Sequence, residues 1–174
     1  MFDFIKRIIQ KYKLSQLPNL HKKRYIPLGK AQKVAFVYNL SDSGAIGAIN
    51  TLCDELSRLG IEYFGVGIST AECTDSLGKN ISQIDSKEVD WIGIPVTLGV
   101  EDVFQREYDI VFDLSTTSSF TIEYLLRRLK CSTIVGYCSC REEYYDITFS
   151  NPDADKCEEC IGQSFKYLNS IKTE

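Results

Sequence analysis

Two close pairs of cysteines are the first residues whose types and spacing could support chemistry. Cys138 and Cys140 form a C-x-C pair, and Cys157 and Cys160 form a C-x-x-C pair. Four thiolates can bind zinc, and the C-x-x-C spacing fits such a site, whereas C-x-C is a less usual partner. The second pair also falls on the apolar face of a predicted helix, where cysteine packs as a small hydrophobic residue. We therefore predict no metal and no other cofactor, with zinc as the alternative.

Polar residues also follow two of the predicted strands. In open α/β sheets, ligands bind outside the carboxyl ends of the strands, so a small polar ligand could contact these two turns. The candidate ligand-binding residues are Asp42, Ser43, Asp113, Ser115, Thr116 and Thr117.

A structural role for the same turns is the stronger expectation. The first turn, residues 40–47, lacks the G-x-G-x-x-G spacing and the Walker lysine of phosphate-binding loops, and Asp42 would repel a phosphate. Serine, threonine and aspartate immediately before a helix are first of all N-caps. We predict that Ser41 or Asp42 caps one helix and that the hydroxyl groups of residues 115–119 cap another.

The sequence does not favour acid–base or nucleophilic catalysis. His21 is the only histidine and lies in a basic segment outside the predicted sheet, so we expect no histidine-dependent triad. No pair of carboxylates is placed in a way that suggests a general acid and base. Trp91, Tyr144 and Tyr145 are interpreted as packing residues. We predict no catalytic residue and a protein that is not an enzyme.

The N-terminal segment is the most specific functional signal. Residues 2–13 place apolar side chains at helical spacing, which predicts an amphipathic helix. Residues 1–30 hold eight of the 20 Lys and Arg but one of the 24 Asp and Glu, which gives +7 there and −11 in residues 31–174. The predicted partner-binding residues are Lys6, Arg7, Lys11, Lys13, Lys22, Lys23 and Arg24.

Three kinds of partner fit this basic helix. It could adsorb to an anionic membrane, contact RNA or the ribosome through phosphates, or bind another protein. The simplest interpretation is different: the apolar stripe packs on this chain or on a partner chain, and the lysines are merely solvated. The sequence leaves these alternatives open.

Alternating strands and helices predict how these residues are positioned. Continuous apolar runs are typical of parallel strands buried on both faces. Amphipathic segments between them predict a single doubly wound, mostly parallel sheet with helices on both faces. The strands are expected at 33–40, 61–69, 109–115 and 132–138, with weaker ones at 81–84 and 144–150. The helices are expected from the N-cap at Ser41 or Asp42 through residue 59, and at 100–108, 116–130 and 153–171.

The chain therefore divides into a basic leader helix and linker, residues 1–32, and a Rossmann-like α/β domain, residues 33–174. No apolar run approaches the roughly 20 residues that a membrane span needs. Charged residues interrupt every stretch in which the apolar core of a secretory signal would lie. The seven cysteines are an odd number and are expected to be reduced, which predicts a cytoplasmic protein, with peripheral membrane association as an option.

Several segments together resemble a known family. The segments 91–95 (WIGIP), 107–115 (EYDIVFDLS), 135–137 (VGY) and 144–146 (YYD) are similar to those of a family of small uncharacterised α/β proteins from Bacteroidota. That resemblance implies no catalytic residues. The chain is more distantly similar to the N-terminal half of two-domain, heptosyltransferase-like glycosyltransferases, but it lacks the half that binds the nucleotide sugar. This likeness implies a domain without a donor site.

Taken together, these features predict a non-enzymatic interaction protein that docks through its basic helix. The alternative is a small-ligand-binding or degenerate glycosyltransferase-like domain that uses the strand ends.

Overall fold

The computed structural model describes residues 2–69, 77–137, 139–149 and 157–171, except for the side chains of residues 98, 139–140 and 157–160. Within these residues, six parallel strands form one sheet in the order β3-β2-β1-β4-β5-β6. This confirms the predicted α/β fold. The strands are β1 (Lys33–Asn39), β2 (Glu62–Ser69), β3 (Ile81–Asp85), β4 (Glu107–Asp113), β5 (Lys130–Gly136) and β6 (Ile147–Thr148).

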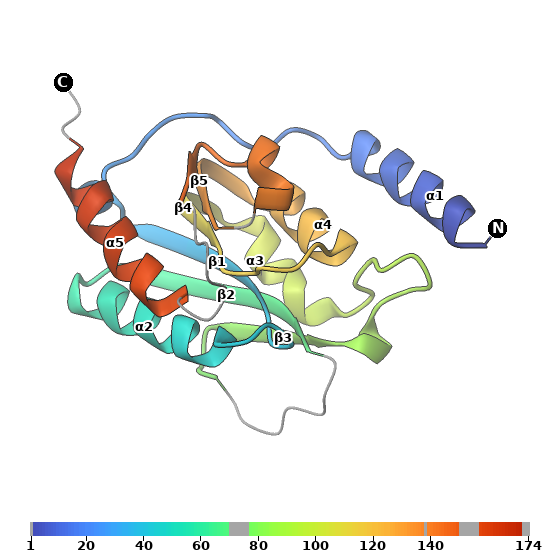
Figure 1. Cartoon of the computed structure of the whole chain (residues 1–174), viewed down its shortest axis with the longest axis horizontal. Coiled ribbons are helices and arrows are strands. Elements are labelled where there is room, and N and C mark those ends of the chain that lie inside the picture. Colours follow the sequence, from blue (N-terminus) through green and yellow to red (C-terminus); the bar gives the residue numbers. More distant parts are fainter. Residues whose placement is uncertain (1, 70–76, 138, 150–156, 172–174) are drawn as a thin grey trace.

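Helices cover both faces of the sheet (Figure 1). On one face lie α2 (Ala45–Arg58) and α5 (Cys157–Ser170), and on the other lie α3 (Glu101–Gln105) and α4 (Phe120–Arg128). Successive side chains of a strand point to opposite faces. Phe36 and Phe112 accordingly join the core under α2 and α5, whereas Val37 and Val111 join the core under α3 and α4. The continuous apolar runs are thus buried on both faces, as predicted.

The structure corrects several predicted boundaries and caps. Helix α2 begins after Gly44, which has a left-handed φ of 74° and provides no side-chain cap, so the predicted caps at Ser41 or Asp42 are wrong. Helix α4 begins four residues later than expected, and Ser119 at its N-cap position makes no side-chain capping bond. Strand β6 has two residues and is shorter than the predicted strand at 144–150, whose first residue belongs to the 3-10 segment 139–144. The hydroxyl groups before α4 are engaged in other bonds, described below.

The basic linker lies alongside the first half of β5. The Lys22 amide donates to the Cys131 carbonyl at 2.8 Å, and the Arg24 amide donates to the Ser132 carbonyl at 2.9 Å. The Thr133 hydroxyl donates to the Arg24 carbonyl at 2.8 Å. These bonds hold the linker against the strand and lead the chain into β1.

The N-terminal helix α1 (Phe2–Gln16) contacts the body through a small part of its surface. Leu14 is its buried residue, and the Gln10 side chain donates to the Ile92 carbonyl at 2.7 Å. Helix α1 lies beside α4, at the end of the molecule opposite α5 (Figure 1). Among the described residues, no helix combines the length and apolar character that a bilayer span requires.

Burial makes one cysteine chemically inert. Cys131 is fully buried in β5, and burial raises the pKa of its thiol from 9.0 to about 12. At pH 8 its thiolate fraction is therefore about a thousandfold below that of an ordinary cysteine. We expect iodoacetamide to alkylate Cys131 at least about a hundredfold more slowly in the native protein than in urea, with a native rate that rises with pH. Peptide mass spectrometry measures both rates, and equal rates would contradict the assignment.

Candidate functional site

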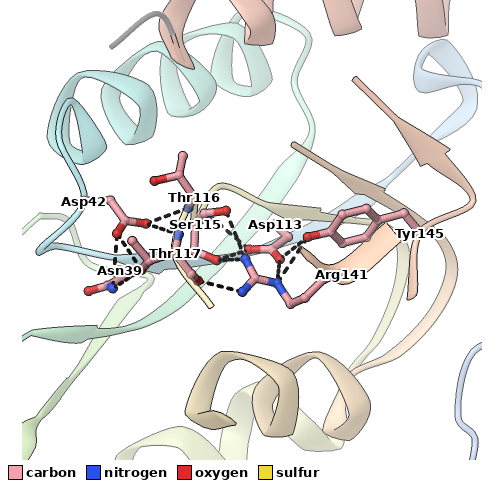
Figure 2. Close-up of polar contacts among 8 residues, drawn as sticks. All are labelled: Asn39, Asp42, Asp113, Ser115, Thr116, Thr117, Arg141 and Tyr145. Atoms are coloured by element: carbon pink, nitrogen blue, oxygen red, sulfur yellow. Dashed lines mark hydrogen bonds and ion pairs between the residues drawn. The ribbon is translucent and has the colours of Figure 1, made fainter. Parts of the chain in front are cut away.

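A buried ion pair lies at the carboxyl edge of the sheet (Figure 2). The Arg141 guanidinium donates through Nε to Asp113 Oδ2 at 2.8 Å, and both side chains are 0% exposed. Asp113 ends β4, and Arg141 lies in the 3-10 segment that follows β5. The parallel register places these two strand ends side by side. Burial alone would lower the pKa of Arg141, but the Asp113 charge raises it, so the side chain stays cationic.

Further hydrogen bonds complete the coordination of this pair. Arg141 donates to the Thr117 carbonyl at 2.7 Å and to the Ser115 carbonyl and hydroxyl at 3.0 and 2.5 Å. The Tyr145 hydroxyl donates to Asp113 Oδ2 at 2.6 Å. Burial, followed by the Asp113 charge, raises the pKa of Tyr145, which keeps the hydroxyl protonated as a donor. Figure 2 shows that these groups converge on the guanidinium.

Asp42 joins the same network from the turn after β1. Its carboxylate accepts the Thr116 amide at 2.6 Å and the Thr117 hydroxyl at 2.8 Å. The Asn39 side chain donates to Asp42 at 3.3 Å and to the Thr117 hydroxyl at 3.1 Å. A carboxylate that caps the amides of a neighbouring loop binds that loop tightly. Asp42 therefore ties the turn after β1 to the turn after β4.

The observed strand order makes the turns after β1 and β4 a possible ligand site. In sheets of order 3-2-1-4-5-6, the connections after β1 and β4 run in opposite directions, and ligands bind in the crevice that opens between them. Here Asp42 bridges these two connections through Thr116 and Thr117. The structure thus brings together five of the six candidate ligand residues, bonded to one another, while Ser43 is exposed. These hydrogen bonds hold the ends of β1 and β4 together.

The sequence reasoning missed Arg141 and Asn39, and it assigned Tyr145 to packing alone. One signal was present: Arg141 is a basic residue shortly after a strand that was expected to lie in the same sheet as the strand ending in Asp113. Without knowing that these two strands are neighbours, Arg141 could not be distinguished from the other basic residues of the sequence.

A second candidate site is the outer surface of α1. Five members of the apolar stripe of this helix are exposed, with exposed fractions from 48% to 77%, whereas Ile9 on the same stripe is half-buried. The interpretation that the stripe packs on this chain is therefore wrong for these residues. They are Phe2, Phe4, Ile5, Ile8 and Tyr12.

The match to a known family covers both sites. A family model described as "Family of unknown function (DUF6913)" matches residues 3–171. The chain belongs to the DUF6913 family. The matched range includes α1 and the linker as well as the sheet, in agreement with the predicted resemblance to an uncharacterised family. No curated protein matches this DUF6913 chain.

In this DUF6913 protein, the linker histidine contacts the sheet. His21 Nε2 lies 2.6 Å from Asp146 Oδ2, and the same oxygen accepts the Ile134 amide at 2.8 Å. A cavity of about 300 Å³ opens beside His21, between the linker and α4, with Arg127 and Tyr144 in its wall. Lys23, Arg127 and the carboxylate of Glu143 are the charged side chains in its wall.

The cysteines of the zinc alternative cannot be placed in this DUF6913 chain. Cys138 lies outside the described residues, and so do the side chains of Cys140, Cys157 and Cys160. Among the described residues, no group of three or more histidine, cysteine, aspartate or glutamate side chains is arranged to hold a metal ion.

Proposed function

We propose that this protein is a peripheral interaction module that adsorbs to an anionic membrane surface through α1. The observation that carries the proposal is the orientation of the helix: its apolar stripe points to solvent, while its opposite side docks on the body. An amphipathic helix that displays its apolar face in this way has the form of an interfacial anchor. The cytoplasmic leaflet, where anionic lipids concentrate, is the proposed target.

The distribution of charge on α1 supports a lipid partner. At 3.6 residues per turn, Arg7 and Lys11 lie along one border of the apolar stripe, and Lys6 and Lys13 lie along the other. This places cations on both sides of a helix that lies in the membrane plane, level with the headgroups. RNA phosphates would use the same lysines but give no reason for an exposed apolar stripe.

The charge of the rest of the chain also favours an orientation in which α1 faces the membrane. Residues 31–174 carry a net charge of −11, so an anionic surface repels them while it attracts α1. The repulsion turns the acidic body away from the membrane. The alternative of a small-ligand or degenerate glycosyltransferase-like site has less support, because most of its candidate groups bond to one another.

Vesicle sedimentation with the full-length protein tests the proposal. We expect binding to vesicles that contain phosphatidylglycerol, weak binding to pure phosphatidylcholine, and loss of affinity as salt rises. Each lysine or arginine near the surface contributes about 1 kcal/mol. Arg7→Glu/Lys11→Glu is therefore expected to weaken binding at least tenfold, and Ile5→Ser/Ile8→Ser about tenfold or more.

Matched controls change the same residue types elsewhere. Lys130→Glu/Lys166→Glu makes the same charge change on exposed residues outside α1, and Ile46→Ser/Leu59→Ser removes exposed apolar groups from the α2 region. Both control variants are expected to retain wild-type affinity. No sedimentation with anionic vesicles would overturn the proposal. Binding to RNA that only the charge reversals weaken, with unchanged affinity in Ile5→Ser/Ile8→Ser, would overturn it in favour of a polyanion.

A further inference from the structure

We infer that a second element, the Trp91 turn (residues 89–96), inserts into the membrane interface beside α1. This inference rests on the proposed function. It adds to that function a fixed orientation of the domain, because a membrane contact that includes the turn as well as α1 restricts rotation of the domain about the helix axis.

The Trp91 turn presents large apolar side chains to solvent. Trp91 is 58% exposed and Val96 is 64% exposed, whereas Ile92 between them is buried. Tryptophan is highly buried on average in folded proteins, so this degree of exposure is unusual. Its amphipathic ring is enriched where a bilayer meets water, because one end is apolar and the indole N–H is polar.

Hydrogen bonds fix the backbone of the turn that exposes Trp91. The Asp90 carboxylate accepts the amides of Ile92, Gly93 and Ile94 at 3.0, 2.9 and 2.8 Å. Val89 and Pro95 form an antiparallel bridge, and the Thr121 hydroxyl of α4 donates to the Gly93 carbonyl at 2.8 Å. A preorganised side chain loses little conformational freedom when it binds. The turn thus holds the indole in an exposed position.

The turn and α1 form one continuous surface. The Gln10 side chain of α1 donates to the Ile92 carbonyl at 2.7 Å, which fixes the turn to the helix. The rings of Phe2 and Trp91 lie 6.4 Å apart, centroid to centroid. In Figure 1, the green segment that follows β3 reaches the same end of the molecule as α1. The exposed apolar stripe of α1 is therefore extended by Trp91.

The acidic residues near the turn are compatible with an anionic surface. Asp90 is engaged by three amides of the turn, and Glu88 accepts the Asp85 amide at 2.9 Å. Both carboxylates therefore accept hydrogen bonds from the backbone. Gln10 bonds α1 to the turn, and α1 carries four basic residues and one acidic residue, so the combined surface joins apolar side chains with basic ones.

Tryptophan fluorescence tests the inference directly, because Trp91 is the only tryptophan in the chain. With phosphatidylglycerol vesicles, we expect its emission to shift to shorter wavelength and its quenching by aqueous iodide to fall. Brominated acyl chains should quench it. Ile5→Ser/Ile8→Ser should abolish these changes at concentrations where the wild type is bound. Trp91→Ser should weaken vesicle binding about tenfold, and Trp91→Phe should weaken it less.

The outcomes separate this inference from the proposed function. Tyr167→Ser, which removes an exposed aromatic ring from α5, is the matched control and should bind as the wild type does. If the protein sediments with vesicles while the emission and iodide quenching of Trp91 stay unchanged, the Trp91 inference is overturned and adsorption through α1 stands. If the protein does not sediment, the proposed function fails, and this inference fails with it. A blue shift produced by self-association without vesicles, seen as a dimer in light scattering, would overturn both.

Discussion

Replacing Arg141 with methionine is expected to lower the free energy of unfolding by about 3–5 kcal/mol. Methionine has a similar reach but no charge, so Asp113 would lose its counter-charge at a site that is 0% exposed. Removing one partner of a buried ion pair leaves an uncompensated charge, which costs more than the pair contributes. Urea denaturation followed by circular dichroism measures the change.

Two further variants make this prediction specific. Arg58 pairs with Glu55 on the exposed surface of α2, so Arg58→Met should change stability by less than about 0.5 kcal/mol. In the double variant Asp113→Asn/Arg141→Met both charges are gone, and a large part of the loss should be recovered. A single Arg141→Met variant as stable as the wild type would show that the pair does not hold the strand ends together.

Gly136→Ala is expected to destabilise the protein by about 3 kcal/mol. A Cβ atom at this position would lie 2.1–2.4 Å from ring atoms of Tyr145, closer than any van der Waals contact. Overpacking typically costs 1–3 kcal/mol. The displaced ring would also lose the 2.6 Å bond from its hydroxyl to Asp113, and a bond to a charged group contributes about 1.5–3 kcal/mol. Thermal or urea unfolding measures the effect.

A double-mutant cycle identifies the cause. In a Tyr145→Ala background the ring is absent, so Gly136→Ala should add little to the loss that Tyr145→Ala already causes. Gly29 has no atom within 4 Å of a Cβ built on it, and Gly29→Ala should leave stability within about 0.5 kcal/mol of the wild type. Full additivity of the Gly136 and Tyr145 substitutions would reject the steric explanation.

Local pattern was sufficient to predict the sheet. Strands β1 and β4 contain the apolar runs 34–38 and 110–112, which are typical of a parallel sheet covered on both faces, and α2 shows apolar spacing along one face. Boundaries were predicted less well where side chains had partners distant in sequence. Residues 115–119 have the composition of a helix cap, but Ser115 and Thr117 bond to Arg141 and Asp42 instead.

The two candidate sites were predictable to different degrees. Asp42, Asp113 and Thr117 could be identified because strand ends meet at one edge of a parallel sheet, whereas Arg141 joins them only through the neighbouring position of β5. For α1, helical periodicity predicts the apolar stripe but not the side on which the helix docks. Docking through Gln10 and Leu14 depends on the Trp91 turn and α4, which no local pattern describes.

The linker that lies along β5 has a consequence for any shortened form of this protein. Its backbone groups bond to the backbone of residues 131 and 132, which β6 does not reach, since β6 pairs with residues 135–136. A fragment that begins after residue 30 would expose this edge of β5 as a template for intermolecular strand pairing. Aggregation of such a fragment would reflect the uncovered strand and not the loss of a binding partner. Truncation at residue 16 removes α1 and leaves the edge covered.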